Sequence, residues 1–345
     1  MRVGICGYPG SGKTTVFSAL APGAGSAKSG VTYGNIKVPD ERIEQLAAIF
    51  QPRRNVYAEI TFMDMGGSGG RFDGGAFPPD VVQNMRNADV LVHVVRNFEN
   101  PMVADIADAS RDVSRFNDEL ILLDLSILER RAERWRRENK KGPEVGVNDR
   151  CVAHLEDGHP LRTLDLSVEE RDTLGGIQLL SLTPLITLFS HSEETWQSTT
   201  GDQKDIQADD INGVSLGLCG EMEAEIAQMK PDDQAEFLEG LGLGEPARNE
   251  FIRAAYQLLD YISFLTAGPD ECRAWPIRKG TIAHKAAGVV HSDIERGFIR
   301  AEIYTFDDIL EHGTEAALKS LGKIRLEGKS YVIQDGDVVN YRFNV

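Results

Sequence analysis

The sequence has 345 residues, of which 41% are hydrophobic and 26% are charged, and its formal net charge is −17. This balance is typical of a soluble globular protein, and the length predicts two or three domains. The acidic excess excludes a whole-surface attraction to nucleic acid, because phosphate binding needs clustered lysine and arginine. With no apolar segment of membrane-spanning length and no leader pattern, we expect a cytoplasmic protein without a membrane partner.

The N-terminal residues combine a strand pattern with a phosphate-binding motif. Residues 1–6 predict a short buried strand, and the following GYPGSGKTT matches G-x-x-x-x-G-K-[ST] at every fixed position. Glycines let such a loop point successive N–H groups at phosphate oxygens, and the helix that follows adds its positive end. The pattern therefore predicts a nucleotide-binding P-loop. Its candidate nucleotide-binding residues are Gly7, Pro9, Gly10, Ser11, Gly12, Lys13, Thr14 and Thr15.

Two side chains of this loop have predicted chemical roles. We expect the Lys13 ammonium to bridge the β- and γ-phosphates of a nucleotide, and the Thr14 hydroxyl to ligate Mg²⁺. Thr32, in the segment before the next predicted strand, is a further candidate metal ligand from a switch region.

A second element on the metal side follows a predicted strand at residues 57–63. The strand leads into Asp64-Met65-Gly66-Gly67, a D-x-x-G sequence. The Asp64 carboxylate can hold the Mg²⁺ shell, and the Gly67 N–H can approach the γ-phosphate. Lys13, Asp64 and Gly67 are therefore the candidate catalytic residues. The glycine-rich residues 66–75 are interpreted as a switch loop, with an ordinary flexible loop as the alternative.

Further along the chain, residues 88–96 and 185–189 predict buried strands, and His93 is interpreted as a core residue rather than a catalyst. Apolar residues at every third or fourth position predict a long amphipathic helix over 103–138. Basic residues gather at its distal end, where binding to ribosomal RNA and a solvated helix face both remain open. These residues are Arg130, Arg131, Arg134, Arg136, Arg137, Lys140 and Lys141.

Several longer stretches resemble the YchF or Obg-like ATPases, a family of P-loop proteins of the translation-factor class. Together they cover nearly the whole chain, which is identified as a divergent member. Besides the P-loop, they are residues 38–54, 60–67, 82–100, 154–170, 264–310 and 327–345.

The resemblance implies an α/β fold with a Ras-like P-loop domain, a coiled-coil-like helical insertion and a C-terminal β-grasp TGS domain. The predicted boundaries are 1–102 with 178–262 for the nucleotide domain, 103–177 for the insertion and 263–345 for the TGS domain. Within the last of these, alternating strand patterns and turn signals predict a compact module of strands and one helix.

The chain departs from this family where the base is read. Obg-like ATPases carry a motif similar to N-x-x-E in the segment that reads the base, whereas this chain has Ser190-His191-Ser192-Glu193 there. Glu193 is retained, but Ser190 lacks the amide that both donates and accepts. Cys219 lies in the last base-side loop. Guanine selectivity through N-K-x-D is therefore not expected, and ATP and GTP both remain open with a preference for ATP.

The function implied is Mg²⁺-dependent binding and slow hydrolysis of ATP or GTP by a P-loop NTPase, whose nucleotide state switches its interaction with the ribosome or translation factors. The insertion and the TGS domain would make that contact. The alternative is a nucleotide-gated binding module with negligible turnover, because no water-orienting side chain is recognisable after Asp64. A nucleotide or nucleoside kinase is a third class, suggested by the spelling of the P-loop.

Overall fold

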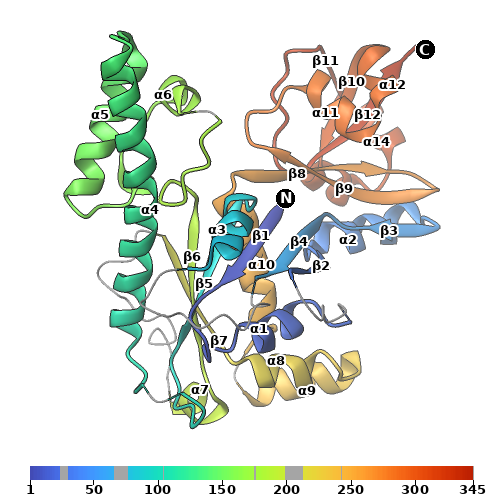
Figure 1. The fold of residues 1–345 in the computed structure, drawn as a ribbon. Helices are drawn as coiled ribbons and strands as arrows, with labels where there is room; N and C mark the ends of the chain where they lie inside the picture. Colours follow the sequence, from blue (N-terminus) through green and yellow to red (C-terminus); the bar gives the residue numbers. More distant parts are fainter. Residues whose placement is uncertain are drawn as a thin grey trace. The chain divides into compact units, whose positions relative to one another are not determined.

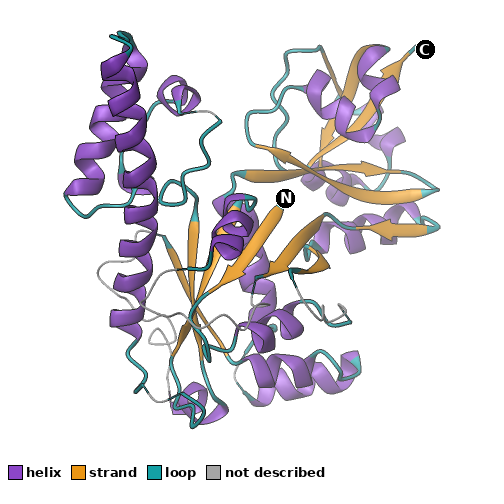
Figure 2. Ribbon diagram, in the orientation of Figure 1, coloured by secondary structure: helices purple, strands orange, loops and turns teal. Residues whose placement is uncertain are grey.

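The computed structural model describes residues 1–23, 30–65, 77–103, 105–174, 176–198, 213–241 and 243–344. The chain divides into two compact units, one of residues 1–36 with 61–251 and one of residues 37–60 with 252–345. Figures 1 and 2 show helices and strands in both units. The assignment of residues 37–60 to the second unit was not predicted, because this segment lies inside the range expected for the nucleotide domain.

The first unit is built on a six-stranded sheet with the spatial order β2 (Thr32–Lys37), β4 (Glu59–Asp64), β1 (Arg2–Cys6), β5 (Val90–Arg96), β6 (Leu185–Ser190) and β7 (Val214–Leu218). β1 pairs in parallel with β4 and β5, and β6 pairs in parallel with β5 and β7. β5 and β6 are buried along their whole length, as expected for apolar strands covered on both faces. The strands predicted at 1–6, 57–63, 88–96 and 185–189 are confirmed.

The helices of this unit are α1 (Lys13–Leu20), α3 (Pro79–Arg86), α4 (Ala109–Arg137), α5 (Pro143–Glu156), α6 (Val168–Thr173), α7 (Glu193–Ser198), α8 (Gly220–Ile226), α9 (Pro231–Gly240) and the start of α10 (Ala247–Leu258). α4 is the predicted long helix, and Figure 1 shows α5 beside its distal half. Across the described part of the chain, no helix has both the length and the apolar character that crossing a membrane requires.

A buried carboxylate fixes α4 to the unit. Asp124 on α4 is fully buried and accepts hydrogen bonds from the backbone N–H groups of Leu180 and Ser181, just before β6. The Arg86 guanidinium lies 3.8 Å from the same carboxylate. Burial raises the pKa of Asp124, and these donors oppose that shift. The acid therefore links α3, α4 and the strand that ends at Ser190.

The second unit contains another six-stranded sheet with the order β11 (Arg325–Glu327), β10 (Phe298–Thr305), β12 (Asp337–Phe343), β8 (Tyr261–Ala267), β9 (Glu271–Arg278) and β3 (Arg54–Val56). It also holds α2 (Glu41–Phe50), α11 (Ala283–Val290), α12 (Ser292–Arg296), α13 (Phe306–His312) and α14 (Glu315–Ser320). The prediction of one helix in the C-terminal module was wrong. The helices there have five to eight residues, too few for a helical repeat to stand out, and caps such as Thr305 and Thr314 start two of them.

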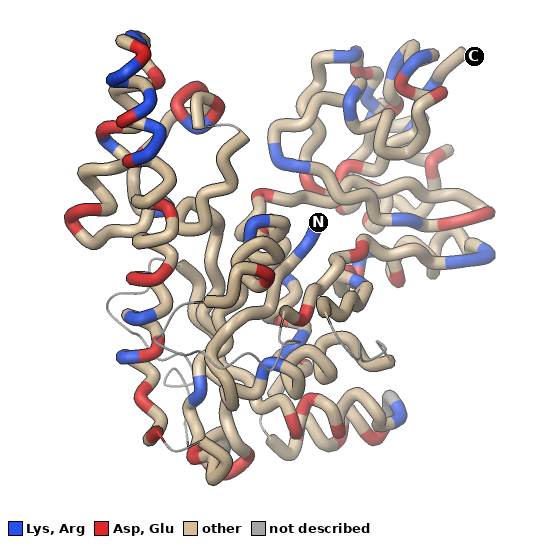
Figure 3. Tube along the Cα trace, in the orientation of Figure 1, with Lys and Arg blue, Asp and Glu red and all other residues tan. Residues whose placement is uncertain are grey.

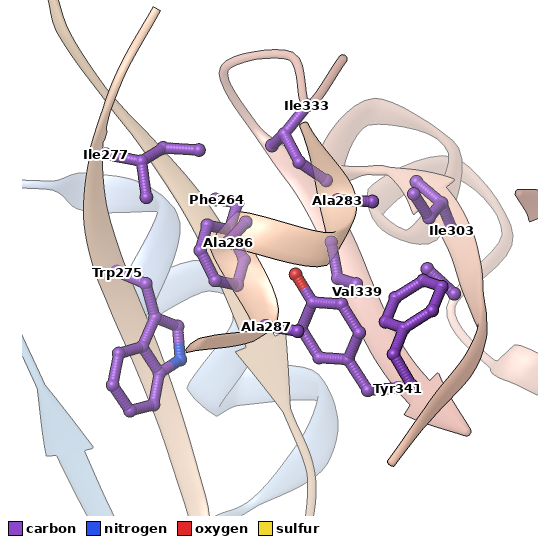
Figure 4. Packing of buried hydrophobic residues seen from close by; sticks show 12 residues of the cluster. Phe264, Trp275, Ile277, Ala283, Ala286, Ala287, Ile303, Ile333, Val339 and Tyr341 are labelled. Atoms are coloured by element: carbon purple, nitrogen blue, oxygen red, sulfur yellow. The ribbon is translucent and has the colours of Figure 1, made fainter. Parts of the chain in front are cut away.

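Aromatic rings on the sheet and alanines on α11 form the core of this unit (Figure 4). Phe264 is fully buried and stacks on Trp275, with ring centroids 6.3 Å apart. Ala283, Ala286 and Ala287 are also fully buried, and their small side chains let the helix backbone approach the sheet.

The segment 37–60 joins this sheet through hydrogen bonds and one strand. β3 pairs in parallel with β9. Arg42 on α2 donates to both Asp40 and Asp335, while Asp335 accepts from the Ser263 N–H. These contacts explain why a segment so early in the sequence belongs to the C-terminal unit.

Replacing Phe264 by alanine should lower the free energy of unfolding by about 3–5 kcal/mol, because a fully buried ring is lost and a cavity remains. Phe343→Ala is the matched control, since Phe343 is 45% exposed in the same sheet and should cost less than about 1 kcal/mol. Urea unfolding followed by circular dichroism measures both. Equal losses would contradict the packing described for this core.

Candidate nucleotide-binding site

The carboxyl ends of the parallel strands of the first unit meet at one edge of the sheet. The register pairs Ile5 with Asp64 and Cys6 with His93, so the P-loop begins beside the end of β4 and the second half of β5. Arg96 pairs with Ser190, which in turn pairs with Leu218 just before Cys219. Ligands of open α/β sheets bind at this edge. The predicted phosphate, metal and base segments therefore start from the same edge.

Three glycines of the P-loop have backbone conformations that other residues rarely adopt. Gly7, Gly10 and Gly12 have φ angles of +147°, +77° and +90°. A Cβ atom at Gly7 would lie 2.5 Å from the Val94 carbonyl oxygen, and one at Gly12 would lie 2.7 Å from Ser190 Oγ. The glycines are therefore required both by the turn and by close packing against β5 and β6.

Lys13, the first residue of α1, is held by the loop that precedes it. Its ammonium donates a 2.7 Å hydrogen bond to the Tyr8 carbonyl oxygen. Burial lowers the pKa of Lys13, while the negative charge of Asp64 opposes this shift. The cation is thus partly desolvated, and an anionic phosphate would offset that cost.

Oxygen donors for a metal converge beside this lysine. The Thr14 hydroxyl lies 3.5 Å from Asp64 Oδ2, and the Asp64 side chain is buried at the end of β4. A hydroxyl and a carboxylate are oxygen ligands of the kind that Mg²⁺ prefers, so these residues fit this ion. Thr32 is the first residue of β2, and its metal role stays a prediction. Gly67 and the loop 66–75 fall outside the described residues.

The base-side residues predicted from the sequence lie near one another and near α1. Ser190 is buried at the end of β6. Its hydroxyl oxygen lies 2.7 Å from the place that a Cβ atom at Gly12 would occupy. Burial raises the pKa of Cys219, and the carboxylate of Glu193 in the first turn of α7 adds to this rise. A Cβ at Gly220 would meet Thr15 Cγ2 at 3.0 Å. The structure thus brings these segments together, while their role in reading a base stays a prediction.

Sequence reasoning missed a turn that covers the P-loop. The Asn100 amide donates to the Gly10 carbonyl oxygen at 3.3 Å, and its own carbonyl accepts from the Met102 N–H. A Cβ at Gly10 would lie 2.3 Å from Val103 Cγ2. The only signal in the sequence is that these residues follow strand β5, because nothing in N-P-M-V itself indicates contact with a distant loop.

Aromatic and acidic residues of α4 pack behind the P-loop. His93 stacks on Phe116, with ring centroids 3.9 Å apart, and is 1% exposed. Burial, together with Lys13 and Arg162, lowers the pKa of His93 to about 3. The ring is therefore neutral, which supports its interpretation as a core residue.

Glu119 of α4 is a buried acid in the same region. It accepts a hydrogen bond from the Phe77 N–H, and its other carboxylate oxygen has no hydrogen-bond partner among the described residues. Burial raises the pKa of Glu119 to about 7, although the Phe77 N–H and Arg115 act in the opposite direction. This carboxyl group therefore titrates near neutral pH.

The raised pKa of Glu119 makes stability depend on pH with a defined sign. Between about pH 4.5 and 7 the folded protein keeps a proton that the unfolded chain has lost, so stability falls as pH rises through this window. Glu119→Gln should remove about 1–2 kcal/mol of this fall, less than the full shift implies because solvent reaches the neighbouring Arg115. Urea unfolding at several pH values measures it, with Glu129→Gln on the exposed face of α4 as control. An unchanged pH profile in Glu119→Gln would contradict the assignment.

The basic end of α4 is only partly neutralised by acidic neighbours. Arg134, Arg137 and Lys140 form ion pairs with Glu138, Glu133 and Glu144, respectively. Figure 3 shows acidic residues between the basic ones at this end of the helix. Arg131 and Lys140 lie over the ring of Trp135, at 4.1 and 4.6 Å from its centroid. These contacts are typical of a solvated helix face, and RNA binding here stays a prediction.

Comparisons with known proteins agree over the full chain. A family model described as YchF-GTPase_C, protein of unknown function (DUF933), matches residues 261–344. The ribosome-binding ATPase YchF of Pasteurella multocida strain Pm70 is 36% identical over 361 residues, covering 100% of this chain and 99% of the relative. The protein of the same name from Bacillus subtilis strain 168 is 32% identical, with 100% of both chains covered.

Solved structures support the same fold. The structure of the Schizosaccharomyces pombe YchF GTPase matches with a TM-score of 0.86 and 25% identity, covering 99% of this chain and 97% of the other. A GTP binding protein from Pyrococcus horikoshii OT3 matches with a TM-score of 0.59 and 19% identity over 100% of both chains, which supports the fold alone.

Proposed function

Because the chain belongs to the YchF family of P-loop NTPases, we propose that it binds a nucleoside triphosphate with Mg²⁺ at the P-loop and hydrolyses it slowly. The observation that carries this proposal is the convergence at one sheet edge of the glycine turn, the Lys13 ammonium and the Thr14–Asp64 pair. Each of these groups suits a different part of a Mg²⁺ triphosphate. Because the chain belongs to a family of NTPases, we no longer consider the alternative of a nucleotide or nucleoside kinase.

The roles of the residues follow from their positions. Thr14 and Asp64 would hold Mg²⁺, which supplies positive charge to the phosphates during hydrolysis. Lys13 orients its ammonium along the P-loop and offsets negative charge on the terminal phosphates. The peptide N–H groups around Gly10 and Gly12 bind phosphate oxygens.

Base choice is the finer part of the proposal. Glu193 begins α7, close enough to Cys219 to affect its pKa, and a carboxylate accepts hydrogen bonds from an exocyclic amino group. The names of the relatives include both ATPases and a GTPase. We infer a preference for ATP, since Ser190 replaces the asparagine with which GTPases support guanine reading.

The proposed partner is the ribosome, as in the names of the bacterial relatives. Ribosome contact would involve the distal end of α4 and the C-terminal module, which we interpret as a TGS domain. The nucleotide state would change this contact through the loop that follows Asp64.

Lys13→Ala should weaken the binding of Mg²⁺-ATP roughly 100-fold, because charge-assisted hydrogen bonds to the phosphates are lost. The fold should persist, since the removed ammonium is partly desolvated. Titration calorimetry and a thermal melt measure the two effects. Lys141→Ala, an exposed lysine of the distal cluster, is the control. Normal ATP affinity in Lys13→Ala would count decisively against this site.

A single-turnover phosphate-release assay with Mg²⁺-ATP and Mg²⁺-GTP tests catalysis and base choice together. We expect slow release that is faster with ATP, and a loss of this preference in Glu193→Ala. Binding without any release, even with ribosomes present, would leave a nucleotide-gated module in place of an enzyme. That outcome keeps the binding site but removes hydrolysis.

A further inference from the structure

We propose that helix α4 positions the catalytic lysine of the P-loop by holding the ring of Tyr8, with Arg115 as the principal contact. The inference rests on the proposed nucleotide site and deepens it by naming positioning residues. Tyr8 occupies a variable position of the P-loop motif, and neither Tyr8 nor Arg115 is among the residues predicted to bind phosphate, metal or base.

The ring of Tyr8 is packed on several sides by residues from other elements. The Arg115 guanidinium lies over it, 5.1 Å from the ring centroid. Phe77 stacks on it at 5.9 Å, and His93 meets it edge-on at 6.0 Å. Phe116, next to Arg115 on α4, contacts both Phe77 and His93. The ring therefore belongs to a cluster whose outer wall is α4.

The backbone of the same residue holds Lys13. The Tyr8 carbonyl oxygen accepts the 2.7 Å hydrogen bond from the Lys13 ammonium and a 3.3 Å hydrogen bond from the Ser11 N–H. The ring and this carbonyl are both attached to the Tyr8 Cα, so packing of the ring restricts the backbone of Tyr8 and with it the carbonyl that holds Lys13. The position of α4 is thus transmitted to the cation through a single residue.

Helix α4 is fixed to other segments of the first unit, so it can hold the Tyr8 ring in a defined position. Asp124 fixes it to the segment before β6, and Glu119, one turn beyond Arg115, accepts the Phe77 N–H. The distal half of the same helix packs on α5. Helix α4 therefore provides a fixed wall against which the Tyr8 ring is held.

The test measures the affinity of the full chain for a Mg²⁺-bound, non-hydrolysable ATP analogue by calorimetry. Tyr8→Ala and Arg115→Ala should each weaken binding about fivefold, which is the size expected for a cation–π contact at a partly exposed site. The double variant should be no weaker than Tyr8→Ala alone, because both changes break the same link. Arg115→Lys keeps a cation over the ring and should restore most of the affinity.

Two controls separate positioning from a general loss of structure. Glu129→Ala removes an exposed charged side chain from the same helix and should leave the affinity unchanged. Leu128→Ala empties part of the α4–α5 core and should lower the melting temperature without a comparable loss of affinity.

The possible outcomes distinguish a failure of the positioning role from a failure of the proposed function. Unchanged affinity in Tyr8→Ala and Arg115→Ala, or strictly additive losses in the double variant, would overturn the positioning role and leave the nucleotide site standing. A wild-type chain that does not bind the analogue would overturn the proposed function, and this inference with it.

Discussion

The partly buried ammonium of Lys13 is the charge around which the first unit is organised. Burial disfavours the cation, so the loop must supply compensation, and the Tyr8 carbonyl and the Asp64 carboxylate provide it. Asp64 is the last residue of β4, and Tyr8 follows the end of β1 by two residues, on a strand that the parallel register places beside β4. The three glycines follow from the same requirement, because only they allow the loop to turn so tightly against β5 and β6.

Buried carboxylates have a second task in this unit, which is to fix α4. Asp124 and Glu119 each accept backbone N–H groups from segments that lead to or from the nucleotide edge. Burial raises the pKa of both carboxyl groups, and the backbone donors oppose that rise. The long helix is therefore joined to the nucleotide-binding unit by hydrogen bonds to the chain itself, and its distal half extends beyond them along α5.

Sequence patterns predicted those elements whose formation depends on residues close together in the chain. A run of β-branched residues, a glycine-rich turn or a three-to-four periodicity acts within about thirty residues, and the corresponding strands, the P-loop turn and α4 were predicted close to their observed bounds. The short helices α11 to α14 were not, because five to eight residues carry too little periodicity. The membership of residues 37–60 in the second unit rests on the pairing of β3 with β9, which no local signal specifies.

The amino-acid sequence by itself supplied the P-loop motif, from which we predict the side chains that meet phosphate and metal, and its longer motifs identified the family. Only the tertiary structure decided which residues surround that loop. Asn100 and Val103 over Gly10, Arg115 over Tyr8, and Ser190 against Gly12 come from distant segments. Contacts of this kind depend on strand order and helix placement, because side chains far apart in sequence meet only after the sheet has formed.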